Sequence, residues 1–190
     1  RFEAGDRLRM AAQPSSTLGT VLTEDEAWLL GIVCADGYVQ NRGTHVRVTN
    51  GDDAILAEAG ACWERVTGGK ATKEKGARSG FSDRHVPHVA LSGNPPYARL
   101  LRSELYCADG CKRVPKRILN AAPHLQEAFL VGYNLGDGLK AGHGIDPFKS
   151  FRTTSPVLAA GLVWLSRTTL GRRVSVYRQG GALGGGDSYQ

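Results

Sequence analysis

Two aspartates, Asp36 and Asp137, occupy the same unusual position in two separate stretches of the sequence. Each ends a short apolar segment and is followed directly by glycine, in 27–37 (AWLLGIVCADG) and in 129–138 (FLVGYNLGDG). If each segment is a helix, its carboxylate falls in the last turn, where the helix dipole is negative and carbonyl groups lack partners. Such a placement, made twice, indicates a compensating cation.

Capping signals support the two helices. Thr23 and Glu26 form a Thr-x-x-Glu capping box before the first apolar segment, and Pro123 suits the first turn of the second. We expect Gly37 to end the first helix in a left-handed conformation and Gly138 to stop the second.

Small residues recur four positions apart in both segments: Gly31 and Ala35, then Gly132 and Gly136. Residues four apart share one helix face, and a face without bulk lets two backbones pack closely. Side-by-side packing would bring together the carboxylates of Asp36 and Asp137 and the carbonyl oxygens of Ala35 and Gly136. Hard oxygen ligands of this kind suit Mg²⁺, or Mn²⁺, better than zinc.

Segments 29–37 (LLGIVCADG) and 130–138 (LVGYNLGDG) resemble the two copies of the LAGLIDADG motif of homing endonucleases, specifically the type carried inside inteins. The third-position glycine and the final Asp-Gly pair match in both copies. The sixth position, usually Asp in the family, is Cys34 in the first copy and Leu135 in the second. The resemblance covers most of the chain, from Leu22 onward.

The resemblance implies a mixed α/β (α+β) fold of two pseudo-symmetric αββαββα repeats, whose antiparallel sheets form a saddle over DNA. It also implies site-specific cleavage of double-stranded DNA by a monomer, with Mg²⁺ or Mn²⁺ held between Asp36 and Asp137. Intein endonucleases carry a catalytic lysine shortly before a proline ahead of the second motif, and Lys112, before Pro115, matches that pattern. In the natural protein, an intein splicing domain would be joined in cis.

Repeat boundaries follow from the positions of the two motifs, whose aspartates lie 101 residues apart (137 − 36). We assign 21–113 to the first repeat and 114–190 to the second, which lacks the last strand and helix of the first. Residues 1–20 resemble the border between a splicing domain and its endonuclease.

Elements expected from periodicity and turn signals follow the order helix, two strands, helix, two strands, helix in the first repeat. After the first motif helix they are strands 38–40 and 44–49, helix 54–66, strands 70–75 and 84–91, and helix 95–105. In the second repeat we expect strand 148–154, helix 157–170, strand 173–178 and a partner strand beginning at 189.

A twisted antiparallel ribbon fits the DNA major groove, so outward polar residues of the strands are the candidate DNA contacts. They are Gln40, Arg42, Arg47, Lys73, Lys75, Arg84 and His88 in the first repeat, and Lys149, Arg152, Arg173, Tyr177 and Arg178 in the second.

Composition agrees with a polyanionic partner, since the 190-residue chain has a formal net charge of +6 and a pI of about 9.3. No apolar run is long enough to span a membrane and the start is polar, so we expect a cytoplasmic protein. The four cysteines form no recognisable disulfide framework. Cys107 and Cys111 could ligate a metal, but no second pair has matching spacing, and reduced thiols are the simpler interpretation.

Two other functions remain open at this stage. A catalytically degenerate LAGLIDADG domain could bind DNA or RNA as a maturase or regulator; the retained aspartate pair argues against this, and the changed sixth positions argue for it. Autonomous protein splicing is not expected, because the sequence begins with Arg1, ends with Gln190 and contains no His-Asn pair.

Overall fold

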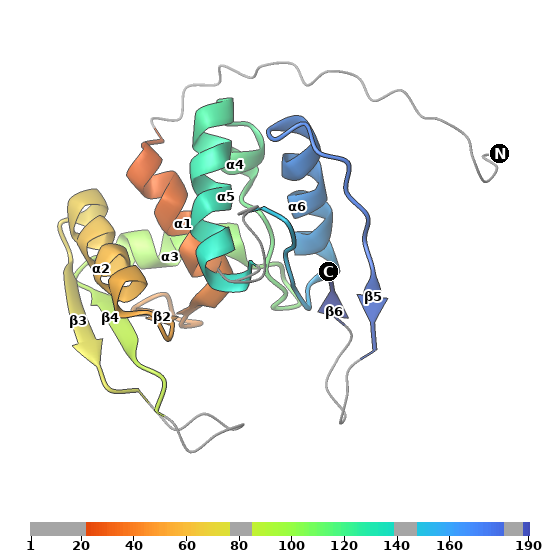
Figure 1. Ribbon diagram of the computed structural model, residues 1–190. Helices are drawn as coiled ribbons and strands as arrows, with labels where there is room; N and C mark the ends of the chain where they lie inside the picture. Colours follow the sequence, from red (N-terminus) through yellow and green to blue (C-terminus); the bar gives the residue numbers. More distant parts are fainter. Residues whose placement is uncertain (1–21, 77–84, 139–147, 181–187) are drawn as a thin grey trace, which may run out of the picture.

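The computed structural model describes residues 22–76, 85–138, 148–180 and 188–190. Helices and short antiparallel strands alternate along the chain (Figure 1). In the first half the elements are α1 (Glu24–Asp36), β1 (Gly37–Val39), β2 (Val46–Thr49), α2 (Asp53–Thr67), β3 (Lys70–Glu74), β4 (His88–Ser92) and α3 (Pro95–Leu105). They continue with α4 (Lys116–Leu119), α5 (Pro123–Asp137), α6 (Pro156–Thr168), β5 (Arg178–Gln179) and β6 (Ser188–Tyr189).

Helices α1 and α5 pack against each other at the centre of the molecule (Figure 1). A methyl group on Gly31 would overlap the carbonyl oxygen of Phe129, and one on Gly132 would overlap the carbonyl oxygen of Trp28. Each glycine therefore touches the backbone of the other helix, as the spacing of small residues predicted. The rest of α1 is apolar on nearly every side and is buried, as expected for a helix enclosed by other elements.

Four antiparallel strands form a sheet in the order β1-β2-β4-β3. Its register puts Val39, Val46, Leu91 and Ala71 in one row that faces α1 and α2. Side chains alternate between the two faces of a strand, so the neighbouring row points away from the helices. That row consists of Tyr38, Arg47, Ala90 and Thr72, and we call the surface to which it belongs the open face.

The first half confirms the expected order of helices and strands, but Gly37 differs from its expected conformation. Gly37 has φ −89° and ψ 155°, and Gly138 has φ −83° and ψ 169°, so both are extended and neither is left-handed. Glycine is needed for space instead, because a methyl group on Gly37 would overlap the backbone of Val33. The extended conformation lets the chain pass directly from α1 into β1.

The second half departs further from the expected pattern. Segment 148–154 is not a continuous strand, and only Phe151 and Thr153 form isolated bridges, to Gly138 and Tyr189. Segment 173–178 pairs only at its end, in β5 with β6. The short helix α4 was not expected; it has a single turn, too short for a periodic apolar pattern.

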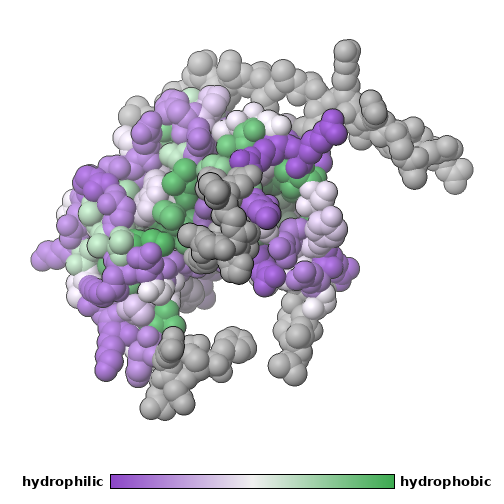
Figure 2. Space-filling view, in the orientation of Figure 1, coloured by the Kyte–Doolittle hydropathy of each residue, from purple (hydrophilic) through white to green (hydrophobic). Residues whose placement is uncertain are grey.

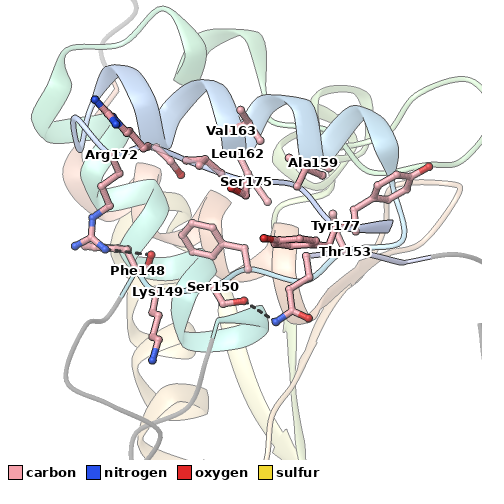
Figure 3. Close-up of a pocket in the computed structure, with 17 residues that line it drawn as sticks. Phe148, Lys149, Ser150, Thr153, Ala159, Leu162, Val163, Arg172, Ser175 and Tyr177 are labelled. Carbon is pink, nitrogen blue, oxygen red and sulfur yellow. Dashed lines mark hydrogen bonds between the residues drawn. The ribbon is translucent and has the colours of Figure 1, made fainter. Parts of the chain in front are cut away.

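A cavity of about 570 Å³ lies between α6 and the chain segments around Phe148 and Tyr177 (Figure 3). Leu162 and Val163 of α6 line one side. At the edge of the cavity, Arg172 donates a hydrogen bond to the Phe148 carbonyl at 3.3 Å. In the first half, Trp63 and Leu56 of α2 are buried in the core. No helix in the described ranges is both long and apolar enough to cross a bilayer.

Candidate functional site

Asp36 ends α1 at the point where α1 meets α5. A methyl group on Gly136 of α5 would lie 3.1 Å from Asp36 Oδ2, so the absence of a side chain at Gly136 makes room for this carboxylate. The same oxygen accepts a hydrogen bond from Asn50 Nδ2 at 2.5 Å. Asp36 is half-buried and lies directly against the last turn of the partner helix.

Asp137 follows Gly136 at the end of α5 and is also half-buried. The hydroxyl of Tyr133, one turn earlier, lies 3.4 Å from Asp137 Oδ2 and donates to the Arg152 carbonyl at 3.0 Å. Burial raises the pKa of Tyr133, and the negative charge of Asp137 adds to the shift. The phenol is therefore a neutral donor beside the carboxylate.

Lys112 supplies a positive charge to the end of α1. Its Nζ lies 2.8 Å from the Cys34 carbonyl oxygen, 3.0 Å from that of Ala35 and 2.7 Å from that of Gly37. A fourth carbonyl, that of Val33, is at 3.2 Å. These contacts satisfy orphan carbonyls of the last helical turn and oppose the negative end of the dipole. Part of the compensation that the sequence assigned to a metal thus comes from an ammonium group.

The ionisation of Lys112 reflects two opposing effects. Burial lowers the pKa of its ammonium group, while the negative charges of Asp137 and Asp36 act to raise it. Both carboxylates therefore lie close enough to Lys112 to act on its charge. This places the three residues predicted to be catalytic around one point, the shared ends of α1 and α5.

Neighbouring residues hold Lys112 in place from both sides. Its own carbonyl accepts a hydrogen bond from Ser155 Oγ at 2.5 Å, at the start of α6. The next residue, Arg113, donates to the carbonyls of Glu104 and Ser103 at the end of α3, at 2.9 and 2.7 Å. Lys112 is consequently fixed between elements of the first and second halves.

The donor set at the ends of the two helices is compatible with a hard divalent cation. Two carboxylates and the backbone carbonyls of Ala35 and Gly136 are oxygen ligands, which Mg²⁺ and Mn²⁺ prefer. Among the described residues no group of three or more acidic, histidine or cysteine side chains gathers. Further ligands would have to come from DNA or water. The Ala35 carbonyl already accepts from Lys112, which leaves one of its two lone pairs.

The open face of the sheet carries some of the predicted DNA contacts. Arg47 and Gln40 are exposed there, and Arg42 is exposed in the turn between β1 and β2. Tyr38, 55% exposed, lies opposite Arg47 and was missed. Lys70 was missed too; it is exposed and alternates with Ala71, which faces the helices.

Two of the predicted contacts on the sheet are paired with carboxylates of the protein itself. Lys73 shares a face with Ala71, toward α2, and pairs with Asp53 at 2.8 Å. His88 is buried, and its Nε2 lies 2.7 Å from Glu74 Oε2. Of the other predicted residues, Lys75 is exposed beyond β3, and Arg84 lies outside the described residues, as does the expected border segment 1–20.

Helix α6 and strands β5 and β6 of the second half lie on the other side of α1 and α5 from the sheet (Figure 1). Lys149, Arg152, Arg173, Tyr177 and Arg178 are all exposed. Strands therefore flank the ends of the two central helices on both sides. In Figure 2 hydrophilic side chains cover much of the visible surface over the sheet, and hydrophobic ones appear mainly toward the middle.

No protein-family profile matches the sequence, and no curated protein matches it. Among solved structures, the fold is similar to "The crystal structure of I-DmoI in complex with DNA and Mn", with a TM-score of 0.52 and 15% sequence identity over 87% of both chains. This chain has the fold of I-DmoI. I-DmoI is a LAGLIDADG homing endonuclease. The match confirms the predicted fold class, a mixture of helices and antiparallel sheet, whereas the pseudo-symmetry of the two halves stays a prediction.

Proposed function

We propose that this chain is a site-specific, metal-dependent endonuclease for double-stranded DNA, of the LAGLIDADG type. The observation that carries the proposal is the meeting of Asp36, Asp137 and Lys112 at the ends of a glycine-packed helix pair. Two facts add support. Exposed cations lie both on the sheet and in the second half, and the fold is shared with I-DmoI, whose structure contains DNA and Mn.

In this proposal Asp36 and Asp137 would hold a divalent cation together with the carbonyls of Ala35 and Gly136. Such a cation would supply a water of lowered pKa and stabilise the leaving oxygen of the phosphodiester. Lys112 would hold the end of α1 in place and reduce the repulsion between the carboxylates and the phosphate. Arg47 and the other exposed cations would position the backbone of the duplex, and side chains of the open face would contact bases.

We further propose the intein-borne subtype, because Lys112 precedes Pro115 and the second motif as in that group. A double-stranded target, a single-chain active unit of two pseudo-symmetric repeats and a cytoplasmic location belong to the same proposal. All four cysteines are reduced in the structure, which agrees with that location.

Cleavage of a randomised plasmid library in the presence of Mg²⁺ or Mn²⁺ tests the proposal. We expect the wild-type chain to enrich a defined cut site. Asp36→Asn and Asp137→Asn should retain binding to that site and lose cleavage, because each keeps the shape of the side chain and removes its charge. Cleavage by either variant at the wild-type rate would refute the assignment.

A second candidate is a DNA- or RNA-binding module without cleavage. It is favoured by the position of Lys112, whose ammonium faces four backbone carbonyls rather than an open surface. The same library distinguishes the two functions, since a binding module would select a sequence by retention on the protein and leave it uncut.

A further inference from the structure

Asn50 is a buried polar residue that the sequence did not single out. It follows β2 directly, and only 7% of it is exposed. Its Nδ2 donates to Asp36 Oδ2 at 2.5 Å, across 14 positions of the sequence. A buried amide aimed at a half-buried carboxylate restricts the orientation of that carboxylate, because turning away would leave the amide without its partner.

The orientation of the Asn50 amide is itself set by the chain. Asn50 Oδ1 accepts a hydrogen bond from the backbone N–H of Asp52 at 2.9 Å. Asp52 is the cap of α2 and accepts from Ala54 N at 2.8 Å. With its oxygen engaged in this turn, the amide can present only its nitrogen to Asp36. The start of α2 is thereby connected to the carboxylate through one side chain.

Thr153 holds the corresponding place before α6. It lies two residues before the cap Ser155, as Asn50 lies two before Asp52, and its Oγ1 accepts from Ser155 N at 3.1 Å. In both halves a side-chain oxygen accepts from the backbone N–H two residues later. Thr153, however, has no amide group that could donate to Asp137. Asp137 has instead the Tyr133 hydroxyl at the longer distance of 3.4 Å.

We propose that Asn50 is a positioning residue that orients Asp36 for binding a divalent cation at the ends of α1 and α5. This inference rests on the proposed function and adds to it a residue that acts through Asp36. Hydrogen-bond partners of metal ligands commonly change metal affinity about 10- to 100-fold when removed.

Asn50→Thr is the sharpest variant, because it copies the arrangement found at Thr153. The threonine hydroxyl can accept from Asp52 N and keep the start of α2, but its oxygen is bonded to Cβ, one bond short of the position from which Asn50 Nδ2 donates to Asp36. Asn50→Ala removes both bonds and serves as the comparison for loss of the turn. We expect Asn50→Thr to lower the melting temperature less than Asn50→Ala does, because it keeps the hydrogen bond from Asp52 N.

Two measurements test the role, one of them without metal. In the NMR spectrum of the metal-free protein, the Asn50 side-chain amide should exchange slowly and should shift in Asp36→Ala but not in Asp137→Ala. Binding of Mn²⁺ to the protein–DNA complex, followed by electron paramagnetic resonance, should then weaken by about tenfold or more in Asn50→Thr.

The outcomes separate this inference from the proposed function. Wild-type protein that binds Mn²⁺, together with Asn50→Thr that binds it equally well, overturns the role of Asn50 and leaves the nuclease proposal intact. Wild-type protein that binds no Mn²⁺ with or without selected DNA overturns both. The positioning role is also overturned if the Asn50 side-chain amide exchanges rapidly and its NMR signal does not shift in Asp36→Ala.

Discussion

Replacing Lys112 by methionine tests whether its ammonium group stabilises the end of α1. Methionine keeps most of the length and the apolar part of the side chain and removes the charge and all three donors. In the wild-type structure Lys112 Nζ lies 2.7 to 3.2 Å from four carbonyl oxygens. The variant therefore changes one group while leaving the helix sequence untouched.

The expected loss of stability follows from the carbonyls that are left without donors. Val33 O also accepts from Gly37 N, so it keeps a partner. The carbonyls of Cys34 and Ala35 belong to the last turn, where helical partners run out. Each unsatisfied buried carbonyl costs about 1–3 kcal/mol. Removing a buried ammonium gives back part of this, because its own desolvation disappears.

We take the net loss for Lys112→Met as about 2–4 kcal/mol, which is the carbonyl cost reduced by the recovered desolvation. For a chain of this size, each kcal/mol lowers the melting temperature by about 2–4 °C, so the expected decrease is about 4–16 °C. Thermal unfolding followed by circular dichroism measures this directly. Lys116→Met is the matched control, since Lys116 is exposed four residues further on and should change the melting temperature by less than about 2 °C.

A Lys112→Met variant with the melting temperature of the wild type would refute this reasoning. If that variant also lost DNA cleavage, Lys112 would act on the phosphate during the reaction instead of on the backbone of α1. A lower melting temperature that Lys116→Met reproduces would mean that the charge of this segment matters and the contacts to α1 do not.

Three further predictions concern packing, DNA contact and ionisation. Gly132→Ala should lose about 3 kcal/mol of stability in chemical denaturation, because its methyl group would meet the backbone of α1 rather than a movable side chain. Gly51→Ala is the control and should be near neutral, because nothing lies within 4 Å of the added methyl group. Lys70→Ala should weaken DNA binding and reduce by about one the slope of the logarithm of the DNA-binding constant against the logarithm of salt concentration. Lys73→Ala should leave this slope unchanged, because Lys73 pairs with Asp53. Burial raises the pKa of Cys62 to about 12. The preference for the neutral thiol therefore stabilises the folded state fully below the unfolded pKa of about 8.5, and this stabilisation is lost as the pH rises toward 12. Urea unfolding across that pH range should show a smaller decrease in the free energy of unfolding for Cys62→Ser than for the wild type. Equal decreases in the two proteins would contradict the raised pKa of Cys62.

Signals that lie close together in the sequence were reliable for this protein. The helix 95–105 was placed correctly because two prolines open it, and the cap Thr23 accepts from Glu26 N at 3.1 Å. The Glu26 carboxylate, the other half of the expected capping box, contacts Tyr97 and Arg117. The close packing of α1 and α5 was also predictable, since small residues four apart leave a helix face without bulky side chains. Periodic patterns and caps depend on neighbouring residues, so tertiary structure changed them little.

Strand faces were predicted less well, because alternation tells which residues share a face but not which face is covered. Lys73 was placed on the wrong surface for this reason, since it pairs with Asp53 of α2. His88 shares the open face with Arg47, but it is buried there and pairs with Glu74. Short pairings such as β5 with β6 have no periodic signal long enough to bound them.

The amino-acid sequence by itself determined the two carboxylates, their glycine-rich helices and the net positive charge. Only the tertiary structure decided what surrounds the carboxylates. Asn50 donates to Asp36 from 14 residues away, and Lys112 reaches the Ala35 carbonyl from 77 residues away. Contacts over such separations arise when helices and strands pack, because the chain must be folded before these donors and acceptors come within hydrogen-bond distance.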